Sequence, residues 1–375
     1  MPARRGDIEP ERAFMEQALA LAVLGEGSTT PNPRVGCVLV RAGRVVGRGY
    51  HHAAGTCHAE ALAVREAGAR ARGATLYVNL EPCAHHGRTP PCADLLVESG
   101  IRRVVASLID PNPQVNGRGA KRLADAGVAV EIGLLAEQAR RVNEPFLHWH
   151  GTGRPLVTLK AAASLDGMLS AAGGSSRWIT GEAARRFAHR LRLRHDAILV
   201  GAGTVRRDDP SLTVRLKGVD ATRRRVVLAP HLKLSARARV FERASDDPVP
   251  PLIYACHEGP SGEELAGRAE IVRVGSLAGC LSLREVLADL GSRGIQSVLV
   301  EGGGRTLAGF LAAGLADRAA VFFAPSLFGG RGGTPMLAGT TVDSPEHAIR
   351  IDPRETIALG QDLLVLGAIV PGIAA

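Results

Sequence analysis

Apolar and polar positions along residues 1–150 follow periods that predict helices and strands in turn. Apolar side chains recur every three or four residues from Phe14 to Leu24, which predicts an amphipathic helix. Short apolar runs such as Val35–Val40 predict strands that are buried in a sheet. We expect further strands at 44–50, 75–80, 103–109 and 128–132, and further helices at 58–72, 92–99, 119–126 and 136–148. This order predicts α/β layers with at least partly parallel strands.

A second series of elements begins after the segment His150–Pro155, whose two glycines and proline are typical of a linker. Ser282 and Glu285 form a capping box that opens a helix ending near Gly294. Strands are expected at 156–161, 197–200, 225–228, 252–255, 297–300 and 319–323. We therefore predict two α/β domains, residues 1–149 and 154–375, which suits a chain of 375 residues.

Composition and charge narrow the class of protein. The chain is 45% hydrophobic, which excludes global disorder, and no apolar run approaches the ~18–20 residues that span a bilayer. The charged N-terminal segment lacks the apolar stretch of a secretory signal, so we expect a cytoplasmic protein with no membrane partner. Six cysteines in such a chain do not indicate a disulfide framework.

The charge pattern indicates a small anionic ligand. The formal net charge is +9, of which residues 1–150 carry +3, and the excess is scattered along the chain. Scattered charge suits a phosphorylated small molecule better than a long nucleic acid. Aromatic residues make up only 3% of the chain, which disfavours a surface for base stacking. The sequence is also compatible with a homo-oligomer.

The strongest chemical pattern is His58-Ala59-Glu60 followed by Pro82-Cys83 and Cys92. One imidazole and two thiolates are good zinc ligands, and three protein ligands leave a fourth position for water. Zinc lowers the pKa of bound water toward ~7. Glu60, two residues after His58, is placed to move a proton from that water to a leaving amine. The H-x-E…P-C pattern is typical of zinc deaminases.

The spacing of the cysteines leaves alternatives open. Eight residues separate Cys83 from Cys92, where the common pattern has two. The segment is a structural zinc loop, or the two cysteines are unrelated buried residues, or a longer loop returns Cys92 to the metal. His85 and His86 then compete as ligands, and we favour Cys92 because paired cysteines complete the pattern.

Four segments of the first domain resemble the deaminase half of the RibD family of bifunctional riboflavin-biosynthesis deaminase/reductases. They are T-P-N-P-R-V-G at 30–36, H-A-E at 58–60, 81–92 and 110–119. The long loop between the cysteines is normal in that family. The resemblance implies a cytidine-deaminase-like α/β/α domain with His58, Cys83 and Cys92 as zinc ligands and Glu60 as the catalytic proton shuttle. It also implies that Asn32 contacts the pyrimidine ring, although a residue between two prolines is otherwise explained as a turn.

Glycine clusters in the second domain do not form the G-x-G-x-x-G pattern of a dinucleotide fold. Gly201-Ala202-Gly203 lacks the third glycine. Gly302-Gly303-Gly304 lies between an expected strand and a helical pattern, which is a weak indication of a phosphate site. Segments 160–167, 176–180, 203–215 and 300–303 resemble the reductase half of the same family, which is similar in fold to dihydrofolate reductase and binds NADPH without a Rossmann domain.

The resemblance implies two sets of ligand-binding residues in this domain. The substrate set is Ser176, Arg192, Leu212, Arg215 and Glu301. Arg192 and Arg215 are suited to clamp a phosphate, and Glu301 to accept hydrogen bonds from the substrate. Lys160 and Asp166 either act on the sugar or form an ion pair and a turn. The NADPH set is Ala162, Trp178, Thr204, Asp208, Gly303, Gly304, Arg305, Thr306, Leu307, Ala308 and Gly309.

These inferences together predict a bifunctional enzyme of riboflavin synthesis. Its first domain carries out zinc-dependent hydrolytic deamination of 2,5-diamino-6-(5-phosphoribosylamino)pyrimidin-4(3H)-one. Its second domain uses NADPH to reduce the ribosyl group of 5-amino-6-(5-phosphoribosylamino)uracil to ribityl. The alternative is a nucleic-acid deaminase with an appended nucleotide-binding domain, which requires a basic, aromatic-bearing channel. A zinc-stabilised binding module is a third hypothesis, and the acidic Glu60 argues against it.

Overall fold

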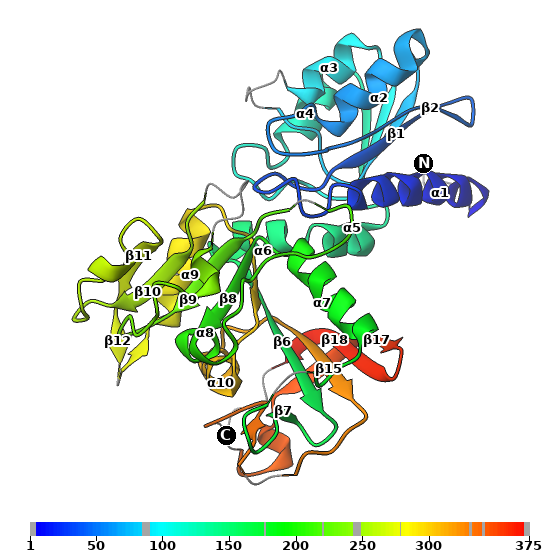
Figure 1. The fold of residues 1–375 in the computed structure, drawn as a ribbon. Helices are drawn as coiled ribbons and strands as arrows, with labels where there is room; N and C mark the ends of the chain where they lie inside the picture. The colour runs from blue at the N-terminus through cyan, green and yellow to red at the C-terminus, as the bar shows by residue number, and fades with distance from the viewer. Residues whose placement is uncertain are drawn as a thin grey trace. The chain divides into compact units, whose positions relative to one another are not determined.

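The computed structural model describes residues 5–84, 91–175, 178–219, 221–242, 249–277, 279–329, 332–339 and 342–370. The chain divides into two compact units, Met1–Gly153 and Arg154–Ala375 (Figure 1). No helix among these residues is both long and apolar enough to cross a membrane.

A five-stranded sheet in the order β2-β1-β3-β4-β5 forms the centre of the first unit. β1 runs antiparallel to both β2 and β3, whereas β3, β4 and β5 are parallel. The expected helix at 14–24 begins earlier, at Arg5, and the one at 58–72 ends in a 3-10 turn. The elements are α1 Arg5–Val23, β1 Gly36–Arg41, β2 Arg44–Tyr50, α2 Ala59–Ala67, β3 Thr75–Val78, α3 Cys92–Glu98, β4 Arg103–Ala106, α4 Arg118–Asp125, β5 Ala129–Ile132, α5 Ala136–Val142 and α6 Glu144–Thr152.

Each face of this sheet carries its own hydrophobic core. On one face, alanines of α2 pack with Leu96 of α3, Leu123 of α4 and the inward side chains of β1, β3 and β4. On the other face, Met15 of α1 packs with residues of α5 and α6. Successive side chains of a strand point to opposite faces, so one sheet supplies both cores. The result confirms the predicted α/β/α arrangement.

The second unit is built on a nine-stranded sheet in the order β11-β10-β9-β8-β14-β6-β15-β18-β17. Strands β11 to β15 in this order are parallel, and β18 and β17 add an antiparallel hairpin at one edge. The elements of this sheet and its helices are β6 Leu156–Ser164, α7 Glu182–Arg194, β8 Ala197–Gly201, α8 Ala202–Asp208, β9 Arg224–Leu228, β10 Leu252–Cys256, β11 Glu270–Val274, α9 Leu283–Ser292, β14 Ser297–Val300, α10 Gly304–Ala312, β15 Arg318–Ala324, β17 Arg350–Leu359 and β18 Asp362–Val370. Two small hairpins pair β7 Met168–Ser170 with β16 Thr334–Pro335, and β12 Ser276–Leu277 with β13 Cys280–Leu281.

Helices cover both faces of the nine-stranded sheet (Figure 1). α9 and α10 bury Leu287 and Phe310 on one face, and α7 and α8 bury Leu191 and Val205 on the other. The predicted capping box is half formed: the hydroxyl of Ser282 accepts a hydrogen bond from the backbone N–H of Glu285, but the Glu285 carboxylate accepts from the N–H of Gly275 and not from that of Ser282. Parallel order sends the carboxyl ends of β8 and β14, and hence the segments after them, to the same edge of the sheet.

Candidate functional site

Two helix starts and one loop bring three metal-ligating side chains together in the first unit. His58 immediately precedes α2, Cys92 is the first residue of α3, and Cys83 lies in the segment after β3. Their ligand atoms all lie within 4.8 Å of one another. The Nδ1 atom of His58 is 3.2 Å from the sulfur of Cys92 and 3.6 Å from that of Cys83. A nitrogen and two sulfur donors at these separations fit a tetrahedral zinc ion with one open position.

Electrostatics within the cluster favour the thiolate of Cys83 but the protonated forms of Cys92 and His58, so a bound cation has to displace the last two protons. Hydrogen bonds from Cys92 and His58 lower the pKa of the Cys83 thiol. The backbone N–H of Cys92 also donates to the Cys83 sulfur, at 3.3 Å. The contact with Cys83 raises the pKa of His58 in turn. The competing histidines, His85 and His86, lie outside the described residues.

Glu60 lies beside this cluster in the first turn of α2, and its side chain is only 3% exposed. Burial raises the pKa of its carboxyl to about 7, and the negative charge of Cys83 adds to the shift. A carboxyl with such a pKa can both accept and donate a proton near neutral pH. The arrangement therefore places a proton-transfer group next to a three-ligand metal site.

A cavity of about 500 Å³ opens over Glu60, His58 and Cys83. Asn32 lines it, and the amide nitrogen of Asn32 lies 3.1 Å from Nε2 of His51. Nδ1 of His51 is 3.2 Å from the carbonyl oxygen of Cys57, so this nitrogen carries the proton. The Asn32 amide therefore donates to His51, which leaves its carbonyl oxygen as an acceptor for a ligand.

Glu81 is a structural member of this site to which the sequence analysis assigned no role. Its buried carboxylate accepts hydrogen bonds from the backbone N–H groups of Asp110, Gly117 and Ala120. Two of these donors lie at the start of α4, where the N-cap residue Gly117 has no side chain. Glu81 thereby fixes the loop that carries Asp110 and Asn112 into the cavity wall. Its place directly before Pro82-Cys83 was the one available indication in the sequence.

In the second unit, the two glycine clusters meet at one edge of the sheet. Gly201–Gly203 follows β8 and Gly302–Gly304 follows the adjacent strand β14. A Cβ atom at Gly201 or Gly302 would lie within 3 Å of the Thr306 side chain, so these glycines are required by packing. A Cβ at Gly203 would meet nothing within 4 Å, and one at Gly303 only the Thr204 hydroxyl at 3.8 Å. Open glycines beside an uncapped start of α10 fit a phosphate of NADPH.

The other residues expected to bind NADPH differ in how accessible they are. Leu307, Ala308 and Gly304 are buried, so any ligand contact there is made by backbone atoms. Arg305 is exposed, and Thr204, Asp208, Thr306, Gly309 and Ala162 are half-buried. Trp178 is 70% exposed and stacks on the guanidinium of Arg185, 4.5 Å from its ring centroid. Ser176, expected to bind substrate, lies outside the described residues.

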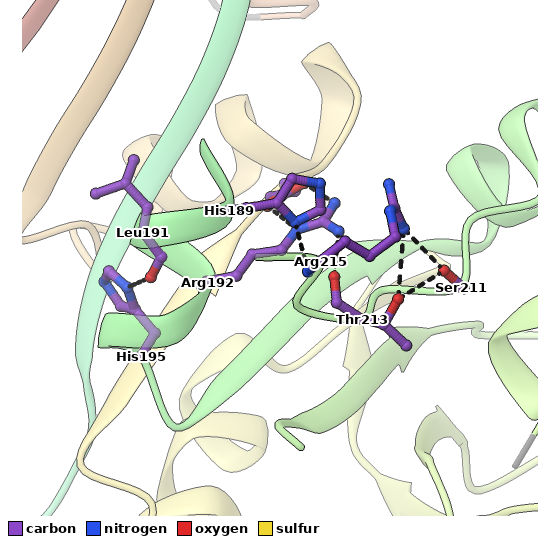
Figure 2. Close-up of polar contacts among 8 residues, drawn as sticks. His189, Leu191, Arg192, His195, Ser211, Thr213 and Arg215 are labelled. Atoms are coloured by element: carbon purple, nitrogen blue, oxygen red, sulfur yellow. Dashed lines mark hydrogen bonds and ion pairs between the residues drawn. The ribbon is translucent and has the colours of Figure 1, made fainter. Parts of the chain in front are cut away.

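An ion pair whose side chains are 13% and 11% exposed joins Arg192 and Glu301, two of the residues expected to bind substrate. Nε and Nη2 of Arg192 each donate to the Glu301 carboxylate at 2.8 Å, and Nη1 donates to the carbonyl of Thr213 at 2.8 Å. Burial opposes the charge of Glu301, but Arg192 and Lys160 outweigh it and lower the pKa to about 2. Nε and Nη2 of Arg192 are thus both occupied by Glu301. The Arg215 side chain bonds only through Nη1 among the described residues, so its other N–H groups can donate to a ligand (Figure 2).

Leu212 and Arg215 lie on a turn that is held from several sides. Leu212 has a left-handed φ of 55° and is only 2% exposed, so its side chain belongs to the core and only its backbone can reach a ligand. The side chain of Arg215 is exposed, and its Nη1 donates to the hydroxyls of Ser211 and Thr213.

Lys160 and Asp166, whose roles the sequence left open, have different surroundings in the structure. Lys160 lies on β6 with its Nζ 5.7 Å from the ring centroid of Phe322, and burial lowers its pKa. Asp166 instead accepts hydrogen bonds from the Ser164 hydroxyl and the N–H groups of Phe328 and Gly329. These bonds lower the pKa of Asp166, so its carboxylate holds a turn.

Comparison with protein families assigns a different model to each unit. The model of the cytidine and deoxycytidylate deaminase zinc-binding region matches residues 8–108. The model of the RibD C-terminal domain matches residues 155–365. The zinc-binding deaminase site of the first unit is the cluster formed by His58, Cys83 and Cys92.

Characterised relatives and solved structures match the chain over nearly its whole length. The riboflavin biosynthesis protein RibD of Aquifex aeolicus is 41% identical, over 95% of this chain and 98% of the relative. The Escherichia coli protein of the same name is 43% identical over 84% and 88%. Acinetobacter baumannii RibD superposes with a TM-score of 0.88 at 37% identity, covering 97% and 99% of the two chains. The diaminohydroxyphosphoribosylaminopyrimidine deaminase/5-amino-6-(5-phosphoribosylamino)uracil reductase of Thermotoga maritima superposes with a TM-score of 0.84 at 36% identity, also covering 97% and 99%.

Proposed function

The chain belongs to the RibD family of bifunctional riboflavin-biosynthesis deaminase/reductases, and from this premise we propose how each unit acts. The first unit replaces the 2-amino group of 2,5-diamino-6-(5-phosphoribosylamino)pyrimidin-4(3H)-one by oxygen and releases ammonia. The second, residues 154–375, then reduces the ribosyl group of 5-amino-6-(5-phosphoribosylamino)uracil to ribityl with NADPH. The observation that carries the proposal is the buried Glu60 beside His58, Cys83 and Cys92 in a cavity of about 500 Å³.

In the deaminase unit, His58, Cys83 and Cys92 hold zinc, which when bound lowers the pKa of water and makes it a nucleophile. Glu60 takes up a proton on its carboxylate and delivers it to the departing amino nitrogen. The Asn32 carbonyl oxygen, oriented by His51, accepts a hydrogen bond from a ring N–H. The cavity is large enough to receive a pyrimidine with its ribosyl substituent.

In the reductase unit, NADPH supplies a hydride to the sugar carbon that is reduced. The cofactor set holds it through Thr204, Thr306 and the backbone at Gly303, while Arg215 binds the substrate phosphate. Glu301, fixed by Arg192, accepts hydrogen bonds from the substrate. The charges of Glu301 and Arg192 both act on Lys160. Lys160 gives a proton to the oxygen released as the sugar ring opens.

The location of the protein follows from the same chemistry. The cysteines at positions 37, 57, 83, 92, 256 and 280 form no disulfide. Thiolate metal ligands persist in the reducing cytoplasm, and we place the enzyme there.

Mass spectrometry of the diaminopyrimidine ribosyl phosphate, incubated with zinc-loaded protein, tests the proposal. Without NADPH we expect the deaminated product alone, and with NADPH the deaminated and reduced product. Deamination without reduction would leave the second unit a different substrate or cofactor. No turnover by protein with confirmed zinc content would overturn the substrate assignment and favour a nucleic-acid substrate instead.

A further inference from the structure

His189 on α7 lies among the charged groups of the expected substrate site, although no role has been assigned to it. Figure 2 shows its ring beside Arg192 and next to the backbone of Arg215. The charges that reach it are those of Arg192, Arg215, Lys160 and Glu301. It lies three residues before Arg192 on the same helix, a spacing that places two side chains on one face.

The hydrogen bond of His189 defines its protonation state. The backbone N–H of Arg215 lies 3.2 Å from Nδ1 of His189. A backbone N–H can only donate, so Nδ1 must carry a lone pair and the ring must be neutral. The pKa of His189 agrees, because burial and the positive charges of Arg192 and Arg215 lower it to about 4.

This bond is one of three constraints on the turn that presents Arg215. Leu212 is buried in the core with a left-handed φ of 55°, a conformation that a leucine keeps only where its surroundings impose it. Arg192 holds the carbonyl of Thr213, and His189 holds the N–H of Arg215. The Arg215 side chain folds back only through Nη1, onto Ser211 and Thr213. Its Nε and Nη2 have no partner within the described part of the chain.

We propose that neutral His189 is a positioning residue of the reductase site, which fixes the backbone at Arg215 and so directs the open side of its guanidinium toward the substrate phosphate. This inference rests on the proposed function, since it assumes that Arg215 binds that phosphate. An imidazole meets the need because it offers an acceptor at Nδ1 without adding a negative charge that would compete for Arg215.

The test compares two replacements of similar size and shape, His189→Asn and His189→Leu. The Oδ1 atom of Asn can occupy the place of Nδ1 and accept the same bond, whereas Leu cannot. The probe is ribose 5-phosphate, titrated calorimetrically into the full-length protein, together with KM and kcat for reduction. In His189→Leu we expect Kd and KM to rise about tenfold, the scale of one misplaced charge-assisted hydrogen bond, with kcat within about twofold. In His189→Asn both should stay within about threefold of the parent.

A double-mutant cycle with Arg215→Ala separates this role from simple packing. Adding His189→Leu to Arg215→Ala should weaken ribose 5-phosphate binding no further, because the effect acts through Arg215. Additive losses, or equal losses in the Asn and Leu variants, would overturn the inference. If Arg215→Ala weakens binding and His189→Leu does not, only the role of His189 fails. If Arg215→Ala itself has no effect, the proposed phosphate contact fails and the inference fails with it.

Discussion

Glu60 and Glu66 lie on the same helix, α2, but in opposite environments. Glu60 is 3% exposed beside the metal ligands, whereas Glu66 is exposed and accepts a hydrogen bond from the backbone of Arg48. In Glu60→Gln the amide cannot relay a proton, so we expect kcat for ammonia release to fall about 10²–10⁴-fold. Zinc content, measured by plasma mass spectrometry, should stay at the level of the parent.

Glu66→Gln provides the matched control, since it makes the same chemical change on the same helix away from the cavity. Both activities should be retained in that variant, and reduction should be retained in Glu60→Gln. Persistent deamination by zinc-loaded Glu60→Gln would show that another group moves the proton.

The Arg192–Glu301 pair makes the stability of the second unit depend on pH. The pKa of Glu301 is about 2 in the folded protein, below the ordinary value of 4.5. Its contribution to stability is therefore complete above pH ~4.5 and is lost as the pH falls toward 2, because the unfolded chain takes up the proton first. A shift of this size corresponds to about 3 kcal/mol.

Glu301→Gln should remove this dependence and lower stability even at pH 7, because it leaves Arg192 buried without its counter-charge. Hydrogen exchange of β14 peptides in urea, compared between parent and variant from pH 3 to 7, measures the difference. Parallel curves for the two proteins would contradict the assignment of the low pKa to Glu301.

At the residue scale, local patterns predicted the metal site of the first unit but not the pairing of His189 with Arg215 in the second. His58, Glu60, Cys83 and Cys92 belong to short motifs whose residue types themselves specify the chemistry. His189 was hidden among the arginines of α7, and its partner Arg215 is 26 residues away. Only tertiary structure brings such a pair together.

At the scale of elements, two glycines of β2 determine how closely α2 approaches the sheet. A Cβ atom at Gly49 would lie 2.0 Å from the carbonyl oxygen of Ala59, and one at Gly47 would lie 2.2 Å from that of Ala63. The start of α2, which carries His58 and Glu60, is therefore placed by backbone contact with a strand. Gly49→Ala must displace this helix start, and with it the ligand His58.

We expect Gly49→Ala to lower the free energy of unfolding of the first unit by about 1–3 kcal/mol and to weaken zinc binding. Thermal unfolding and competition with a chromogenic zinc chelator measure the two effects. Gly151→Ala is the control, because a Cβ at Gly151 of α6 meets nothing within 4 Å. Equal behaviour of the two variants would mean that α2 can shift without affecting the metal ligands.

The apolar periods predicted the inner strands of the second sheet, but they did not predict β11 at one edge or β18 and β17 at the other. The run of β17 is exposed along nearly its whole length, so it lacks the alternation of a half-buried strand. β18 extends to Val370 and pairs with β15, which places residues 368–370 in the sheet. Within the described part of the chain, β17 pairs only with its hairpin partner β18, and β18 in turn pairs with the distant β15, a contact that a local pattern does not record.

At the scale of the whole molecule, each activity has its ligands within one unit. The zinc ligands and the cavity residues all lie before Gly153, and the residues proposed to hold NADPH and the ribosyl substrate all lie after Arg154. The family models divide the chain in the same way, at residues 8–108 and 155–365. Loss of one ligand should therefore inactivate one reaction and spare the other.

Removal of zinc tests this independence directly. After dialysis against a chelator, ammonia release should fall to background, because the zinc ion that activates the attacking water has been removed. Reduction of separately prepared 5-amino-6-(5-phosphoribosylamino)uracil should keep its kcat and KM within about twofold. Calorimetric unfolding should show a lower transition temperature for the first unit alone, because bound metal stabilises only the fold that holds it. Zinc should restore both properties. If reduction also stops and returns with zinc, the two units are coupled, and the reductase site then depends on a first unit that is held in shape by its metal.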